Sequence, residues 1–320
     1  MRLLFITSNR LGDAVLSTSV LRHYVETYPG IRVTVACGPV AAPIFEGVPN
    51  LERIITMPKQ KRGGHWWKLW KLVVLNWWDI IVDLRGSATA YVLPGWKRLV
   101  LQGNDDRVHR VEQMASTIGL AHWLYPKVWT KSEHRERANN LLPNDGRKVL
   151  AIGPSANWGG KTWAADRFIE LIAYIRASDG LLPNAHLLLV GAPNERDAAK
   201  PVIDSLKPED RTVIFGDEHL LTVQACLERS DLYVGNDSGL MHMAAAAGIP
   251  TLGLFGPTRE ENYGPCGPTT AHVRADKSVE EIWKAGEIWR SHETQMDSLP
   301  IEKVFQAARE LLARKDGSVR

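Results

Sequence analysis

Cysteine is scarce in this sequence, and the patterns that usually accompany it are missing. Among 320 residues there are three cysteines, Cys37, Cys226 and Cys266, and their spacing fits neither a metal site nor a disulfide framework. We therefore expect no structural metal, no disulfide scaffold and a reducing, cytoplasmic location. The formal net charge of +3 is also too small to predict binding to nucleic acid.

Long apolar runs are missing as well. The opening sequence MRLLFITSNRLGD turns polar after four apolar residues, which we expect to be too few for a secretory signal peptide. The most apolar window, HWWKLWKLVVLNWWDIIV at 65–82, is interrupted by Lys68, Lys71, Asn76 and Asp79, so it is not predicted to span a membrane. With 44% apolar and 23% charged residues, the composition is that of a globular protein.

Short apolar segments that alternate with amphipathic ones are plentiful instead. Parallel sheets joined by crossover helices have this pattern. We predict an α/β fold with two Rossmann-like domains whose parallel sheets face a cleft. The strands are predicted at 3–8, 32–38, 79–86, 148–155, 186–193, 212–217, 231–237 and 251–257, and the helices at 13–27, 164–178, 195–206, 220–229 and 239–247.

A polar stretch, KSEHRERANNLLPNDGRK at 131–148, separates the two series of elements and ends in a turn signal. We place the domain boundary there, so that the first domain covers 1–145 and the second 146–298. The segment 299–314 has apolar residues at helical spacing. It is predicted to form an amphipathic helix that packs back on the first domain.

The loop after the first predicted strand contains Gly12 and Asp13, within TSNRLGDAVLSTSVLRHYV. One interpretation is that Asp13 only caps the helix, because carboxylates are favoured at helix N-termini. The other is that its carboxylate faces the cleft from the carboxyl edge of the sheet and accepts a proton. No GxGxxG pattern is present, which disfavours a nicotinamide-dependent enzyme.

A second loop, GPSANWGGKTWAADRF at 153–168, also follows a predicted strand. Ser155 and Asn157 sit in a glycine-containing loop, and Lys161 comes just before a helix, which together would suit a phosphate. Taken alone, the loop is better explained with Lys161 as a solvated surface lysine. The GxxxxGK[ST] order of a Walker loop is absent.

A third loop lies in DLYVGNDSGLMHMAAAAGIPTLGLFGPT at 231–258. Asn236, Asp237 and Ser238 are all good helix caps, and Gly239 lets a ligand approach the backbone. The N–H groups at such a helix start would suit a diphosphate. His242 is spaced to point toward the same end as Asp237, although a single helical histidine also has an ordinary structural explanation.

The segment from Met57 to Asn76 contains no acidic residue and is rich in tryptophan and basic residues. Interfacial tryptophans flanked by lysines are typical of a helix on a membrane surface. We predict that the segment 59–78 docks on the cytoplasmic leaflet or grips a lipid-linked acceptor. An ordinary core helix behind a basic loop is the alternative. The side chains predicted to share one helix face are Trp66, Trp70, Val73, Val74 and Trp77.

The three loops together resemble those of glycosyltransferase family 9, the ADP-heptose:lipopolysaccharide heptosyltransferases, which have the GT-B architecture. The stretch 231–258 is similar to the family's D-[ST]-G-x-x-H-x-A-A signature and the F-G-x-T that follows it. RLGDAVLSTSVLR resembles the N-terminal G-D loop, IGPSANWGGKTWAADRFIEL the donor-phosphate loop ending in K-x-W, and HRVEQMASTIGL at 109–120 a first-domain helix. The resemblance covers nearly the whole chain, although ANWGG departs from the Thr, Ser or Arg often found in the phosphate loop.

The resemblance implies a role for each matching residue. Asp13 would be the general base that deprotonates an acceptor hydroxyl. The donor would be bound by Ser155, Asn157, Lys161, Glu195, Asp237, Ser238, Gly239 and His242, with Glu195 near the nucleoside ribose. Apart from the resemblance, we predict that the acceptor or the membrane is contacted by Gly12, Lys61, Arg62, Trp66, Trp67 and Lys68.

The reaction implied is inverting transfer of a heptose, or a related sugar, from an ADP-activated donor to a lipopolysaccharide-core-type glycolipid. It would need no metal or other cofactor and would take place on the cytoplasmic face of the inner membrane. Asp105-Asp106 is an adjacent pair in a polar turn rather than a metal-binding DxD motif.

Two other functions stay open from the sequence. A non-hydrolysing nucleotide-sugar epimerase would convert the free donor and would have no use for the tryptophan-rich basic segment. A nucleotide-sugar-binding protein without catalysis would keep its function when Asp13 is replaced.

Overall fold

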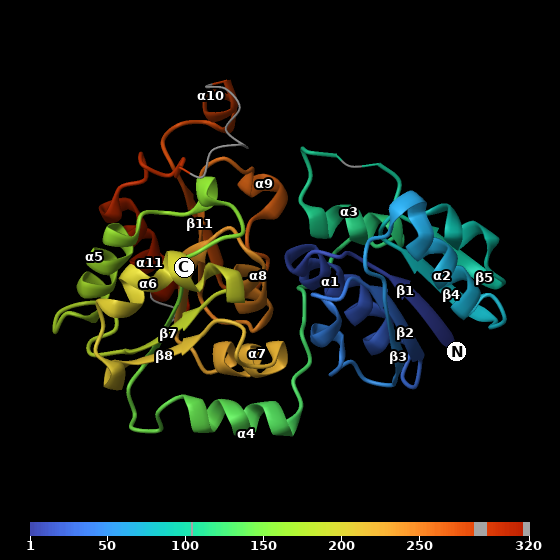
Figure 1. Ribbon diagram of the computed structural model, residues 1–320, viewed down its shortest axis with the longest axis horizontal. Coiled ribbons are helices and arrows are strands. Elements are labelled where there is room, and N and C mark those ends of the chain that lie inside the picture. The colour runs from blue at the N-terminus through green and yellow to red at the C-terminus, as the bar shows by residue number, and fades with distance from the viewer. Residues whose placement is uncertain (104, 285–292, 316–320) are drawn as a thin grey trace. The chain divides into compact units, whose positions relative to one another are not determined.

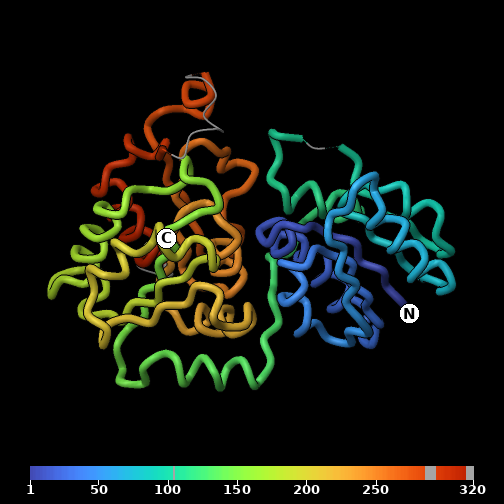
Figure 2. The backbone as a smooth tube through the Cα atoms, in the orientation of Figure 1, coloured from blue at the N-terminus to red at the C-terminus, as the bar shows by residue number. Residues whose placement is uncertain are grey.

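In a computed structural model, residues 1–103, 105–284 and 293–315 of the chain are described (Figures 1 and 2). The chain divides into two compact units, Met1–Lys131 and Ser132–Arg320. Each unit contains one parallel sheet covered by helices. The predicted fold class, two Rossmann-like α/β domains, is confirmed. Among the described residues, no helix has both the length and the apolar character needed to cross a membrane.

The sheet of the first unit has the order β3-β2-β1-β4-β5, and all its strand pairs are parallel. Its strands are β1 (Arg2–Ile6), β2 (Arg32–Cys37), β3 (Leu51–Thr56), β4 (Trp78–Asp83) and β5 (Gly95–Val100). Its helices are α1 (Leu11–Thr27), η1 (Ala42–Phe45), η2 (Lys61–Gly63), α2 (Gly64–Val73), η3 (Ala88–Val92) and α3 (Arg110–Thr117). Because β4 returns to lie beside β1, a topological switch point lies between these two strands, where ligands bind in such sheets.

The central strands of this unit are apolar because both of their faces are covered. Leu3 to Ile6 of β1 are all fully buried, and so are Ile81 and Val82 of β4. Helix α2 places Leu69 and Val73 in the same core, with Trp66, Trp70 and Val74 packed against it. The predicted shared helix face of α2 therefore points mainly inward. Trp77 lies beyond the end of the helix and is exposed.

The sheet of the second unit has the order β11-β10-β9-β6-β7-β8, again parallel throughout. Its strands are β6 (Val149–Gly153), β7 (His186–Val190), β8 (Arg211–Ile214), β9 (Leu232–Asn236), β10 (Thr251–Phe255) and β11 (Thr270–Arg274). Read from β6, this is the Rossmann strand order, with the switch point between β6 and β9.

Helices cover both faces of this second sheet, with α5, α6 and α11 on one side and α7 and α8 on the other (Figure 1). The α-helices are α4 (Ser132–Leu141), α5 (Ala165–Arg176), α6 (Arg196–Asp204), α7 (Leu220–Glu228), α8 (Gly239–Ala246), α9 (Glu260–Tyr263), α10 (Val279–Lys284) and α11 (Ile301–Lys315). Short 3-10 turns are η4 (Gly159–Lys161), η5 (Pro193–Glu195) and η6 (Pro208–Asp210).

Two sequence predictions about the domains differ from the structure. Helix α11 packs on α5, β10 and β11, with Val304, Ala308 and Leu311 in the core of the second unit. The prediction that it packs back on the first domain was therefore wrong, because its apolar stripe is buried beside α5. The boundary falls at 131/132 rather than 145/146. Helix α4 belongs to the second unit because it packs along α7, where Arg229 donates to the carbonyl oxygen of Ala138 at 3.0 Å.

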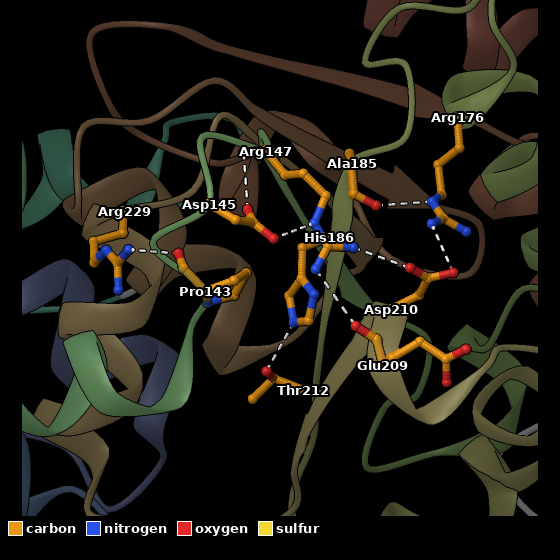
Figure 3. A network of polar contacts seen from close by, with 10 residues as sticks. All are labelled: Pro143, Asp145, Arg147, Arg176, Ala185, His186, Glu209, Asp210, Thr212 and Arg229. Atoms are coloured by element: carbon orange, nitrogen blue, oxygen red, sulfur yellow. Dashed lines mark hydrogen bonds and ion pairs between the residues drawn. The ribbon is translucent and has the colours of Figure 1, made fainter.

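A network of charged side chains links the loops at the amino edge of the second sheet (Figure 3). Arg147 donates to Asp145 at 2.7 Å and to Asp210 at 3.0 Å, and Arg176 lies 3.3 Å from the same Asp210. These contacts tie the start of β6 to the end of α5 and the start of β8. The network lies at the edge opposite the carboxyl ends of the strands, so we assign it to the stability of the fold.

Candidate active site

The polar loops predicted in the second domain gather at the carboxyl edge of its sheet. They follow β6, β7, β9 and β10, and these four strands are neighbours in the sheet. Loops that are up to a hundred residues apart in sequence are therefore brought to one edge. This edge includes the switch point between β6 and β9, where an open α/β sheet binds its ligand.

Lys161 and Asp237 meet across the switch point. The Lys161 ammonium lies 2.6 Å from Oδ2 of Asp237, and both side chains are largely buried. Thr258, after β10, donates its hydroxyl to the same oxygen at 2.9 Å. The interpretation of Lys161 as a solvated surface lysine is thus wrong, because its charge is paired inside the site. The arrangement places one cation, one carboxylate and one hydroxyl at the start of α8.

Trp163 explains why Lys161 is held in this place. Its indole is fully buried, donates from Nε1 to the carbonyl oxygen of Leu299 at 3.0 Å, and packs edge-on against Phe168. Its backbone N–H donates to Oδ1 of Asn236 at 3.0 Å. Asn236 therefore does not cap α8 but fixes the loop after β6 to the end of β9. Lys161, two residues before this anchor, is positioned by both contacts.

The N-terminus of α8 borders the same edge. Ser238 is its cap, and its hydroxyl accepts from the backbone N–H of Met241 at 3.4 Å. Gly239 is the first helical residue, so no side chain stands in front of the first N–H groups. His242 lies in the first turn and is only 4% exposed. The helix start offers backbone donors and a positive dipole end to an anion.

Ser155 and Glu195 form a second polar pair, after β6 and β7. The buried Ser155 hydroxyl donates to Oε2 of Glu195 at 2.8 Å, and the backbone N–H of Ala192 donates to the same oxygen at 3.2 Å. The predicted donor residues of the two loops are thus adjacent in space. Asn157 lies exposed in the same loop.

Tyr233 lies beneath this edge and explains two glycines in the strands. Gly153 of β6 and Gly235 of β9 are register partners. A Cβ added to either would come within 2.1 Å or 2.5 Å of the Tyr233 hydroxyl oxygen. The ring is fully buried, and burial raises the pKa of its hydroxyl, as do the nearby carboxylates of Glu195 and Asp237. Because Gly153 and Gly235 have no side chain, they leave the space that the Tyr233 side chain occupies.

In the first unit, Asp13 lies in the first turn of α1, beyond the cap position, which is Arg10. The interpretation of Asp13 as the cap was therefore wrong. Its Oδ2 accepts from the Ser8 hydroxyl at 3.4 Å, while Thr7 donates to Ser17 at 2.7 Å and holds the loop against the helix. Asp13 is partly exposed at the carboxyl edge, next to Gly12. A carboxylate in this position can accept a proton from a bound hydroxyl.

The basic segment presents most of its predicted residues to solvent. Lys61, Arg62, Trp67 and Lys68 are exposed, and the ring of Trp67 stacks on Trp70 with centroids 4.7 Å apart. Trp66 differs from the others because it is partly buried against the core. The structure therefore separates Trp66 from the four residues with which it was predicted to act.

Sequence reasoning missed several residues at these edges. Thr258 is the last letter of the quoted FGPT, so its presence was visible but its bond to Asp237 was not. Asp83 ends β4 and Arg85 follows it, in DLRG, which was predicted as a strand end without a site. The signal that could have found them is topological: β4 lies beside β1, across the switch point from the loop of Asp13.

The comparison with known families matches this arrangement. The model of glycosyltransferase family 9 (heptosyltransferase) matches residues 107–285, which is more than half of the chain. The chain belongs to glycosyltransferase family 9. It is therefore a glycosyltransferase, and the epimerase interpretation of the sequence is not supported.

Relatives of this family 9 member cover its whole length at low identity. Lipopolysaccharide heptosyltransferase 2 of Salmonella typhimurium is 22% identical, with 98% of this chain and 99% of the relative covered. The solved family 9 glycosyltransferase of Veillonella parvula matches with a TM-score of 0.80 at 20% identity, covering 98% and 97%. The ADP-heptose lps heptosyltransferase II of E. coli matches with a TM-score of 0.74 at 19% identity, covering 99% and 100%. The fold is thus the GT-B architecture predicted from sequence.

Proposed function

We propose that this family 9 member is an inverting heptosyltransferase that uses an ADP-activated heptose and a lipopolysaccharide-core-type glycolipid acceptor. The observation that carries the proposal is the Lys161–Asp237 pair at the start of α8, in a chain whose relatives are lipopolysaccharide heptosyltransferases. The pair lies at the switch point, where an α/β sheet binds a nucleotide. The role of each residue follows from its chemistry.

A carboxylate repels a diphosphate, so we assign the two charges of the pair to different parts of the donor. Lys161, Ser238 and the backbone N–H groups that begin at Gly239 bind the diphosphate. Asp237 accepts hydrogen bonds from sugar hydroxyls and keeps the Lys161 ammonium in place. We assign His242, one turn into α8, to the same phosphate and sugar region.

We assign binding of the nucleoside to the neighbouring pair, Ser155 and Glu195. The carboxylate of Glu195 can accept from the two hydroxyls of a ribose, and Ser155 holds that carboxylate at 2.8 Å. Asn157 is exposed in the same loop and is assigned to the donor as well. The donor thus extends along the edge from β9 to β7.

In the proposed reaction Asp13 accepts the proton of an acceptor hydroxyl as the hydroxyl oxygen bonds to the anomeric carbon. The bond from that carbon to the diphosphate oxygen breaks on the opposite face, and the configuration inverts. The negative charge that develops on the departing nucleotide is stabilised by Lys161 and the N-terminus of α8. These residues already supply the positive charge that a metal ion would supply, so we propose a metal-independent transfer.

The decisive experiment measures heptose transfer from ADP-heptose to lipopolysaccharide purified from a heptose-deficient strain, with and without a chelator. Asp13→Asn and Asp13→Ala should lower kcat by about 10²–10⁴-fold while ADP-heptose affinity is kept. Unchanged kcat in both variants would contradict the role of Asp13 as the base, whereas an absence of transfer by the wild type would favour a non-catalytic binding protein. A thermal-shift screen of ADP-, GDP-, UDP- and dTDP-sugars tests the nucleotide, and stabilisation by UDP- or dTDP-sugars alone would contradict the ADP assignment.

We also propose that the exposed side of α2 and the turn after it dock the enzyme on the cytoplasmic face of the inner membrane. Trp67, Leu75 and Trp77 are 57%, 95% and 58% exposed. They lie among the exposed cations Lys68 and Lys71, the latter 5.3 Å over the Trp67 ring. Apolar anchors and cations on one segment suit an anionic lipid surface.

Vesicle flotation tests this docking. The double variant Trp67→Ser/Leu75→Ser should lose binding to vesicles that contain anionic lipid. Tyr174→Ser, which alters an exposed aromatic residue of the second unit, should not. Equal binding by both variants, or equal binding to vesicles without anionic lipid, would contradict the proposal.

A further inference from the structure

The switch point of the first unit carries a cation to which no role has yet been assigned. Arg85 follows β4, and the loop that contains Asn9 and Asp13 follows the neighbouring strand β1. Arg85 donates from Nη1 to Oδ1 of Asn9 at 3.4 Å, so its side chain reaches across the switch point. In the second unit, the corresponding position is occupied by the Lys161–Asp237 pair.

The turn that carries Arg85 is rigid. The fully buried carboxylate of Asp83 accepts from the backbone N–H of Arg85 at 2.8 Å, and from the N–H and hydroxyl of Ser87 at 2.9 and 2.5 Å. Gly86 adopts a positive φ of 64°, and a Cβ there would come within 2.8 Å of the carbonyl oxygen of Leu101. The backbone on both sides of Arg85 is therefore fixed before any ligand binds.

The loop opposite is fixed as well. Gly38 at the end of β2 packs directly against Asn9, because a Cβ there would lie 2.5 Å from the Asn9 Cα. The backbone N–H of Gly38 donates to the carbonyl oxygen of Ser8 at 3.2 Å. Both ends of the Arg85–Asn9 contact are thus held by backbone interactions.

The guanidinium of Arg85 is partly buried and stacks over Trp66, 4.5 Å from the ring centroid. Among the described residues, no carboxylate oxygen lies within ion-pair distance of it. The charge of Asp83 acts on Arg85 and partly offsets the effect of burial on its pKa, but the Asp83 oxygens accept hydrogen bonds from the turn rather than from the guanidinium. Lys59 and the buried His65 lie close by, and together with burial the charges of Arg85 and Lys59 lower the pKa of His65, which favours its neutral form.

Removing a cation from water without a paired anion is unfavourable, so a bound oxyanion would be stabilised at this position. The planar fork of donors on a guanidinium fits the two oxygens of a carboxylate or phosphate. The exposed Lys59, whose charge acts on His65 together with that of Arg85, adds a second positive charge to this region.

We propose that Arg85, with Asn9 and Lys59 beside it, binds an oxyanion group of the saccharide acceptor, either a carboxylate or a phosphate. This inference rests on the proposed function, because it is the acceptor whose hydroxyl Asp13 deprotonates. Asn9 and Asp13 belong to the same loop, so a group held by Arg85 orients the acceptor relative to the base. Arg85 would then help to decide which glycolipids are used.

A purely structural role for Arg85 is the competing explanation, since its stacking on Trp66 also joins α2 to the end of β4. The experiment therefore compares Arg85→Ala, Arg85→Gln and Arg85→Lys with the wild type on three acceptors. These are lipopolysaccharide from a heptose-deficient strain, the same material after enzymatic dephosphorylation, and the same material after reduction of its carboxyl groups to alcohols. Arg32→Ala is the matched control, because it removes one exposed arginine at the amino end of β2 in the same unit.

We expect Arg85→Ala and Arg85→Gln to raise the acceptor KM by about 10–100-fold, with the KM for ADP-heptose unchanged, and Arg85→Lys to restore part of the loss. The difference between wild type and variant should largely disappear on one of the two modified acceptors, which identifies the group as phosphate or carboxylate. Acceptor binding measured by calorimetry without donor should weaken in parallel.

An acceptor KM equal to that of the wild type, or a rise of the same size on all three acceptors, would overturn the inference. A lower Tm with an unchanged KM would assign Arg85 to the structural role. If the wild type transfers no heptose to any of the acceptors, the proposed function fails, and the inference fails with it. Transfer by the wild type that is indifferent to Arg85 removes the inference alone.

Discussion

The Lys161 ammonium and the Asp237 carboxylate lie 2.6 Å apart, although 75 residues separate them in the sequence. Each is the first ionisable residue of its loop at the switch point between β6 and β9. The pair puts opposite charges at one helix start, so that a donor can be bound through its phosphates and its sugar at once. The pairing also means that loss of either side chain leaves the charge of the other without its partner.

The first prediction concerns the loss of the Lys161 side chain. Lys161→Ala should lower kcat by about 10²–10³-fold, because the charge on the departing nucleotide loses its cation. It should also weaken ADP binding measured by calorimetry and lower the stability by about 1–3 kcal/mol, because the buried Asp237 carboxylate is left without its charged partner. Lys148→Ala breaks a more exposed lysine–aspartate pair, Lys148–Asp231 at 3.0 Å, at the amino edge of the same sheet. That control should keep both ADP affinity and kcat, and a similar loss in the two variants would contradict the assignment.

The second prediction separates the two bonds that hold Trp163. Asn236→Ala removes the acceptor of the Trp163 backbone N–H, which should lower the free energy of unfolding by about 1–3 kcal/mol. It should also weaken ADP binding, because the loop that carries Lys161 is released. Trp163→Phe keeps that backbone bond but loses the indole bond to Leu299 and part of the buried ring. It should lower the Tm while ADP affinity stays close to that of the wild type. Equal effects of both substitutions on ADP affinity would show that Asn236 does not position Lys161.

The third prediction is a pH dependence of stability caused by His186. Its Nε2 lies 2.9 Å from the Thr212 hydroxyl, which donates its own proton to the carbonyl oxygen of Leu141. Nε2 therefore carries the hydrogen, and the buried Nδ1 would have to take up any second proton. Burial lowers the pKa of His186, and Arg147 lowers it further, while Asp145 and Asp210 oppose the shift.

In the unfolded chain this histidine has its ordinary pKa of 6.5. Below pH 6.5 the unfolded state binds more protons than the folded state, so stability falls as the pH falls, by at most about 1.4 kcal/mol per pH unit. Urea unfolding at pH 7.5, 6.5 and 5.5 should show a smaller pH dependence for His186→Gln than for the wild type. His272→Gln, at an exposed histidine, should behave like the wild type. The same pH dependence in His186→Gln and the wild type would contradict the prediction.

The central strands of the fold were predicted from the sequence, as was the edge strand β8, whereas the other three edge strands were not. β1, β6, β7, β9 and β10 are continuous apolar runs because helices cover both of their faces. β3, β5 and β11 lie at sheet edges, where polar residues such as Arg53, Lys97 and His272 are exposed. Their patterns do not repeat strongly enough to predict a strand. Helix α4 was missed for a similar reason, since only His134 and Ala138 of its ten residues are buried.

Site residues that can be recognised within a single loop were predicted from the sequence. Contacts between loops of neighbouring strands were not, because they depend on the topology of the sheet. Asp13, Lys161 and Asp237 stand out because each follows an apolar strand and precedes a helix. The bond from Thr258 to Asp237 and the reach of Arg85 to Asn9 depend on which strands are neighbours. The order of the strands cannot be inferred from any single segment of the sequence, so these contacts could only be found in the folded chain. The inward turn of Trp66 likewise follows from how α2 packs on β4, not from its tryptophan content.

The last prediction concerns the close contact between Gly153 and Tyr233. Gly153→Ala places a Cβ 2.1 Å from the tyrosine hydroxyl oxygen, and the ring has no room to move because it is fully buried. The substitution should therefore destabilise the protein by about 1–3 kcal/mol. Tyr233→Phe removes the clashing oxygen, and the nearest ring atoms then lie at 3.0 and 3.5 Å from the new Cβ. The double variant should accordingly be more stable than Gly153→Ala alone, and urea unfolding of the four proteins measures the coupling. If Gly153→Ala costs the same with phenylalanine as with tyrosine at 233, the glycine is required by a different neighbour.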